Sequence, residues 1–118
     1  MFCFKKKKIQ KYLDQKADNM DAFDLLLSDY ISGEMTQKLA MHGMKHVDIF
    51  VDWTKDFKCI GIQGRYKEYF VDVQIYPTEY NISIDVDEPD DDVMYALQSN
   101  EQIYDALAKA FEEKGKGI

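Results

Sequence analysis

The chain has 118 residues, of which 46% are hydrophobic, with only 6 Gly and 2 Pro. This balance suits one globular domain over residues 1–118 and excludes a disordered chain. The formal net charge is −7, and leaving out the four positive charges of residues 5–8 makes it −11. A surface this acidic repels nucleic acids and anionic membranes and attracts cationic partners, so we expect no nucleic-acid or membrane partner.

The cysteine count and the N-terminal composition bear on the compartment. Cys3 and Cys59 are too few for a disulfide framework, so we expect two reduced thiols. The apolar residues at the start precede the lysines, which is the reverse of a secretory signal, and no window holds the ~20 apolar residues of a membrane helix. The sequence therefore predicts a cytoplasmic location.

The first third of the chain, residues 6–43, is helical in pattern. Asp18 or Asn19 offers a cap at which the helix over 6–31 restarts, so one bent helix and two shorter ones are both open. Steps of three and four residues place one set of apolar side chains on a single face: Ile9, Leu13, Ala17, Met20, Phe23, Leu27 and Ile31.

Two glycines mark the end of this helical region and the short helix after it. Gly33 suits a helix stop, because glycine adopts the left-handed conformation that other residues resist. Residues 34–42 then suit a short helix with Gly43 as its terminator.

From residue 46 to residue 87 the hydrophobic period changes to two, which predicts strands with one buried face. The predicted inward positions are Val47, Ile49, Val51 and Trp53, then Tyr69, Val71, Val73 and Ile75, then Tyr80, Ile82, Ile84 and Val86. Between them FKCIGIQGRY is the weakest strand, because Gly61 and Gly64 leave gaps that suggest a bulge or a close backbone approach. The joints 54–56, 66–67 and 77–79 are short enough to force an antiparallel meander.

The last third has two further elements. Residues 92–98 alternate in the same way and favour a fifth strand, with a short helix as the alternative. Ser99 followed by Gln102 is a capping-box pattern that begins a helix over 99–114, with an inward stripe of Ile103, Leu107, Ala110 and Phe111. The expected fold is α+β: a four- to five-stranded antiparallel meander sheet, with N-terminal helices and a C-terminal helix packed on one face in two layers.

The stretch DVDEPDDD is the most distinctive chemistry in the chain, because six of its eight residues are acidic. It lacks the glycine and the terminal glutamate of the common calcium loop, and Pro89 stands where flexibility is needed. We interpret it as a solvated acidic loop, with a docking patch for a cationic partner as the second interpretation and no metal.

Carboxylates and aromatic residues share the predicted outer face of the sheet. Aromatic anchors surrounded by carboxylates are typical of a surface that steers and binds a basic protein. The alternative is that helices or a second subunit cover the aromatics. The candidate partner-binding residues are Asp48, Phe50, Asp52, Phe70, Asp72, Tyr76, Asp85, Asp87, Glu88 and Asp90.

Catalytic and metal patterns are weaker. His46, Asp48 and Asp52 lie on one side of a strand, but only His42 could add a second imidazole. Cys59 in mid-strand suits a small buried residue, and a Cys59–His46 pair would need two strands to bring it together. No phosphate-binding loop is present. We therefore predict no enzyme activity and no cofactor.

In size, charge and architecture the chain is similar to bacterial immunity proteins and other toxin-neutralising partners as a general class. That resemblance implies a small, non-enzymatic, inhibitor-type protein that docks a basic partner. The alternatives are a homodimer that uses the outer sheet face, and a metal-dependent or thiol enzyme that uses His46, Asp48, Asp52 or Cys59.

Overall fold

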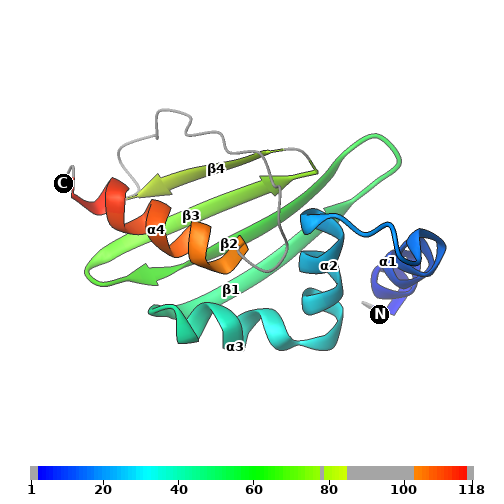
Figure 1. Ribbon diagram of the computed structural model, residues 1–118, viewed down its shortest axis with the longest axis horizontal. Helices are drawn as coiled ribbons and strands as arrows, with labels where there is room; N and C mark the ends of the chain where they lie inside the picture. The colour runs from blue at the N-terminus through cyan, green and yellow to red at the C-terminus, as the bar shows by residue number, and fades with distance from the viewer. Residues whose placement is uncertain (1–2, 78, 85–102, 117–118) are drawn as a thin grey trace.

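A computed structural model describes residues 3–77, 79–84 and 103–116 (Figure 1). Within these residues the sheet has four antiparallel strands in the order β1-β2-β3-β4. The α+β class and the antiparallel sheet are therefore confirmed. In chain order the elements are α1 (Cys3–Lys16), α2 (Ala22–Ser32), α3 (Glu34–Met41), β1 (Met44–Trp53), β2 (Lys58–Tyr66), β3 (Tyr69–Tyr76), β4 (Glu79–Ile84) and α4 (Ile103–Gly115).

The helix predicted over residues 6–31 is two helices, α1 and α2, and the predicted cap at Asp18 or Asn19 is wrong. Asp21 caps α2: its side chain accepts a hydrogen bond from the Asp24 backbone N–H, and the Asp24 side chain accepts one from the Asp21 N–H. This reciprocal capping box satisfies two N–H groups that the first helical turn would leave unpaired. Ala17 lies in the turn before it and is exposed, so it does not belong to the predicted apolar face.

Gly33 and Gly43 end α2 and α3 as predicted. Their φ values are 85° and 99°, in the left-handed region that glycine adopts without strain. Gly33 also precedes the first residue of α3, so α2 and α3 follow one another with no intervening loop.

The strand alternation is confirmed for β1 and β3. Val51, Val71, Val73 and Ile75 are buried in the core, and Val47, Ile49 and Trp53 pack against it. All three joints differ by a residue from the prediction. The β1–β2 turn closes with Thr54 N–H donating to the Phe57 carbonyl, the β2–β3 turn is Lys67–Glu68, and β4 already begins at Glu79. We call this side of the sheet the inner face and the opposite side the outer face.

The strand predicted to be the weakest, β2, is a central strand that pairs along its length with both neighbours. Its inward residues are Ile60 and Ile62, both completely buried. Gly64 faces a register shift in β1 between Lys45 and Asp48, and a Cβ there would come within 2.9 Å of the Lys45 carbonyl oxygen. The lack of a side chain at Gly64 thus allows the Lys45 carbonyl to come close, which is the close backbone approach that the sequence suggests.

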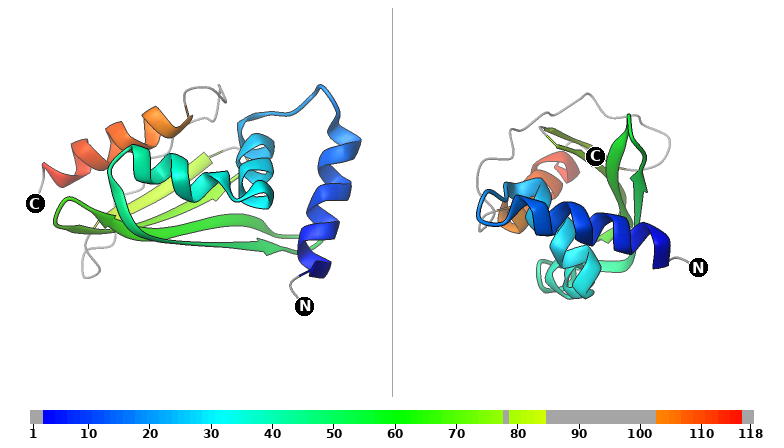
Figure 2. Two further views of the ribbon diagram at one scale, coloured as in Figure 1. Left: turned by 90° about the horizontal axis from the view of Figure 1, so that it is seen from below. Right: turned by 90° about the vertical axis from the view of Figure 1, so that its right-hand side faces the viewer.

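Helices α2, α3 and α4 lie on the inner side of the sheet, and α1 lies beyond one end of it (Figure 2). The buried cluster joins all four helices to the sheet through Ile9, Leu13, Phe23, Leu26, Leu27, Met35, Leu39, Leu107, Ala110 and Phe111. The predicted fifth strand at 92–98, the Ser99–Gln102 capping box and the first residues of the predicted C-terminal helix lie outside the described residues.

Candidate functional site

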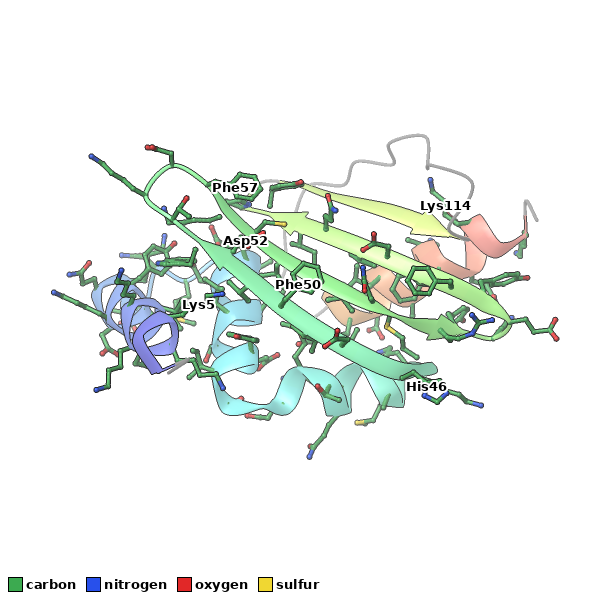
Figure 3. All side chains as sticks on the ribbon, turned by 180° about the vertical axis from the view of Figure 1, so that it is seen from behind. Lys5, His46, Phe50, Asp52, Phe57 and Lys114 are labelled. Atoms are coloured by element: carbon green, nitrogen blue, oxygen red, sulfur yellow. The ribbon has the colours of Figure 1, made fainter. Side chains whose placement is uncertain are left out.

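The outer face carries no helix in the part of the chain that the structure describes (Figures 2 and 3). The pairing register places its positions in rows across β1, β2 and β3. One row holds Asp48, Gln63 and Asp72, and the next holds Phe50, Gly61 and Gln74. Asp52 and Cys59 begin a third row. The structure thus brings the predicted residues of β1 and β3 onto one surface. Phe50 is exposed there, so the described helices do not cover it as the alternative interpretation supposed.

Phe50 stands on the outer face of β1 and is 41% exposed. Its ring lies across the strand next to it, because a Cβ built on Gly61 would come within 2.2 Å of Phe50 Cε2. Glycine at position 61 therefore makes room for the ring to lie against the sheet. An aromatic ring on a glycine of the neighbouring strand covers backbone that would otherwise be bare, and it fixes the cross-strand pair.

Phe57 and Tyr76 form a second aromatic group at the end of the face nearest the β1–β2 turn. Phe57 is 46% exposed, and its ring meets that of Tyr76 edge-on at a centroid distance of 6.0 Å. The sequence prediction missed Phe57 because it lies in a turn, where no periodicity assigns it to a face. Phe70, by contrast, is half-buried and lies at the opposite end of β3, beside Arg65.

Cys59 is buried on the outer side, between Asp52 and the Tyr76 end of β3. Burial raises the pKa of its thiol, and the charge of Asp52 raises it further against the hydrogen bond from Tyr76. The thiol is therefore protonated at neutral pH, which is the unreactive form. The two strands do not bring Cys59 and His46 together: Cys59 pairs with Asp52, six positions from His46, which is about 20 Å along a strand.

The three outer-face aspartates differ in their surroundings. Asp48 and Asp52 are exposed on β1, whereas Asp72 is half-buried on the more central β3. Asp72 Oδ1 is buried and has no hydrogen-bond partner among the described residues. The row of Asp48 and Asp72 makes the middle of the face acidic without an ion pair in that part of the structure.

The histidines and aspartates considered as metal ligands are not arranged around a common point. His46 has a φ of 55° at the register shift, so it does not continue the regular side-chain alternation toward Asp48. His42 faces the other way: its Nε2 lies 2.8 Å from Asp105 Oδ1 on α4, and its Nδ1 lies 2.8 Å from the Lys38 carbonyl. Across residues 3–77, 79–84 and 103–116, no three His, Cys, Asp or Glu side chains gather as a metal site would require.

The remaining candidates, Asp85, Asp87, Glu88 and Asp90, lie outside the described residues. Position 83 in β4 pairs with Asp72 and so extends the row that Asp48 begins, and β4 ends at the next residue, Ile84.

A scan against protein-family models finds no match, and neither the curated proteins nor the solved structures yield a significant one. None of the described helices combines the length and the apolar composition that a bilayer crossing requires.

The contact between Phe50 and Gly61 gives a direct prediction for this face. Replacing Gly61 with Ala is expected to lower the free energy of unfolding by about 1–3 kcal/mol, because the new Cβ must displace the Phe50 ring. In a Phe50→Ala background the same change should cost little. Urea denaturation of the four proteins measures this coupling, with Gln63→Ala as the control on the same strand. Additive effects of the two substitutions, to within about 0.5 kcal/mol, would contradict the contact.

Proposed function

We propose that this protein is a small, acidic, non-enzymatic binding protein that docks a basic protein partner through the outer face. The observation that carries the proposal is the pair of exposed rings, Phe50 and Phe57, on a surface that none of the described helices covers, together with Asp48 and Asp52. Large exposed aromatics act as anchors in protein interfaces, and carboxylates near them raise the association rate of a cationic partner. Catalysis, a metal and a cofactor have no part in it.

The proposal includes an inhibitor or immunity type of role in the cytoplasm, with the two-layer fold holding the outer face rigid. Two layers leave one side of the sheet to bind, and the possible fifth strand at 92–98 and the acidic residues 85–90 would extend that side. The alternative occupant is a second copy of the chain, which the same exposed rings would suit.

The test compares three immobilised proteins for capture from the native cell lysate at low and high salt, with mass spectrometry of the eluate. They are the wild type, an outer-face variant (Asp48→Asn, Phe50→Ser, Asp52→Asn), and a control (Asp18→Asn, Glu113→Gln) that loses the same charge elsewhere on exposed helical and turn positions. We expect the wild type and the control to retain one basic protein that salt releases, and the outer-face variant to lose it.

Two results would go against this proposal. Equal capture by the outer-face variant would exclude the face as the docking surface. A dimeric mass by light scattering that becomes monomeric in the outer-face variant would assign the face to self-association instead.

A further inference from the structure

The free edge of β1 is the feature from which we draw a further inference. β1 is the first strand in the sheet order, so among the described strands it has a neighbour on one side only. In an antiparallel pair, successive residues turn their backbone groups alternately toward the partner strand and away from it. Thr54 N–H donates to the Phe57 carbonyl, and counting back along the register puts Asp52 and Phe50 in hydrogen-bonded pairs with β2. Val51 and Ile49 therefore turn their N–H and C=O groups outward.

A side-chain contact from α1 confirms this direction. Lys5 Nζ donates to the Val51 carbonyl oxygen at 2.7 Å, across 46 residues of sequence (Figure 3). A lysine on a strand edge occupies a carbonyl that another strand could otherwise use. The backbone groups of Ile49, two residues away on the same edge, have no hydrogen-bond partner among the described residues. The register shift between Lys45 and Asp48 ends the regular edge on the other side.

The charges along β1 decide what could pair with this edge. An added strand would place its outer-face side chains beside Asp48, Phe50 and Asp52, because residues directly opposite each other share a face. In a second copy paired about Phe50, Asp48 would face Asp52 of the other chain, and like charges directly opposite each other are destabilising. A strand with Lys or Arg at alternate positions places opposite charges there instead.

We propose that the β1 edge binds an extended basic segment of a partner by strand addition, and that Lys5 leaves Val51 when it does. This rests on the proposed function and specifies how the partner is held. Backbone hydrogen bonds to Ile49 and Val51 supply affinity, and the carboxylates of the outer face select the charge. The residues of the segment opposite Ile49 and Val51 face the inner side, beside the half-buried Val47 and Trp53, so they are apolar.

The probe is a fluorescein-labelled peptide of seven residues that alternates Lys and Val. Its binding to the protein is measured by fluorescence anisotropy at low ionic strength. Two further peptides are methylated on backbone amide nitrogens. The first carries a methyl group on the amide of every Val, and the second on the amide of every Lys that is not at an end of the peptide. Because the Val residues lie opposite Ile49 and Val51, methylating their amides removes donors that face β1. We expect this to weaken binding by about tenfold or more. Methylating the Lys amides should have little effect, since those amides face solvent.

Lys5 is tested separately with Lys5→Met, using Lys7→Met as the control, since Lys7 is also exposed on α1 and its loss removes the same charge. Freeing the Val51 carbonyl should tighten binding of the unmethylated peptide by a factor of about 3 more than the control does. Equal effects of the two substitutions would exclude Lys5 as the group that is displaced.

The outcomes separate this inference from the proposed function. Equal losses from the two methylated peptides, or a larger loss from methylated Lys, would overturn strand addition. If the outer-face variant still loses the captured basic protein in that case, the docking face remains and only the edge pairing is wrong.

Discussion

Replacing Asp24 with Ala is expected to lower the free energy of unfolding by about 2–4 kcal/mol, although Asp24 lies far from the outer face. Its side chain is completely buried where α1 meets α2. It accepts hydrogen bonds from Tyr12 Oη at 2.6 Å and from the Asp21 N–H at 3.2 Å, and it lies 3.2 Å from Lys16 Nζ. Alanine would leave the Tyr12 hydroxyl and the Asp21 N–H without this partner and would break the capping box.

Urea denaturation measures the loss, and Asp14→Ala is the control. Asp14 is an exposed aspartate of α1 whose carboxylate accepts only from Gln10 in the described contacts, so its loss should cost no more than about 0.5 kcal/mol. Equal stabilities of the two variants would mean that the buried carboxylate contributes nothing.

The same residue gives the protein an acid-dependent stability. Burial raises the pKa of Asp24, but the hydrogen bonds from Tyr12, the Asp21 backbone and Lys16 outweigh it, so the pKa lies below its ordinary value. A folded-state pKa below the unfolded one gives stability that is complete above the unfolded value, about 3.9, and is lost as the pH falls through the folded value. The difference between wild type and Asp24→Ala should therefore shrink below about pH 4.

Replacing Phe111 with Ala should cost about 3–5 kcal/mol, which is a large part of the 5–15 kcal/mol that ordinarily separates folded from unfolded domains. Phe111 is 1% exposed on α4, and the centroid of its ring lies 5.5 Å from the ring centroid of Tyr66 on β2. The helix covers the inner face mainly through this ring and its neighbours Leu107 and Ala110. Loss of the Phe111 ring would leave a cavity that the helix and the sheet cannot close without moving.

Denaturant midpoints together with hydrogen exchange of the α4 amides measure this effect. Glu113→Ala is the control, because Glu113 is exposed on the same helix and changes its propensity only slightly. A loss below about 1 kcal/mol for Phe111→Ala, or unchanged exchange in α4, would show that the helix is held chiefly by its polar contacts.

Sequence periodicity is a good guide to the sheet and a poor guide to contacts between helices. A period of two fixes the face of each residue where a strand is regular, so the sequence alone places Phe50 and Asp72 on the outer face. Turn residues carry no such period, which is why Phe57 was missed. Asp21 was missed because three cap-forming residues, Asp18, Asn19 and Asp21, stand close together, although Asp24 three positions later marks the correct one.

Contacts between distant residues leave no trace in a single sequence. The His42–Asp105 pair spans 63 residues and the Tyr104–Asp29 hydrogen bond spans 75. Lys5 at the β1 edge is similar, because a lysine run on a helix reads as a solvated surface whether or not one member reaches a strand. Such contacts depend on how the helices are placed on the sheet, which packing of the whole core determines.

The order of the strands has a consequence for how the chain folds. Each strand pairs with the one before it in sequence, so the meander can grow by successive hairpins with short loop closures. Helix α4 is different, because its contacts reach back to residues 29, 42 and 67, with Lys67 and Glu112 separated by 45 positions. The entropy lost in closing those large loops is therefore lost in a single late step, the docking of α4. Folding should therefore show an early phase in which the sheet gains protection and a slower one in which α4 docks and completes the inner side.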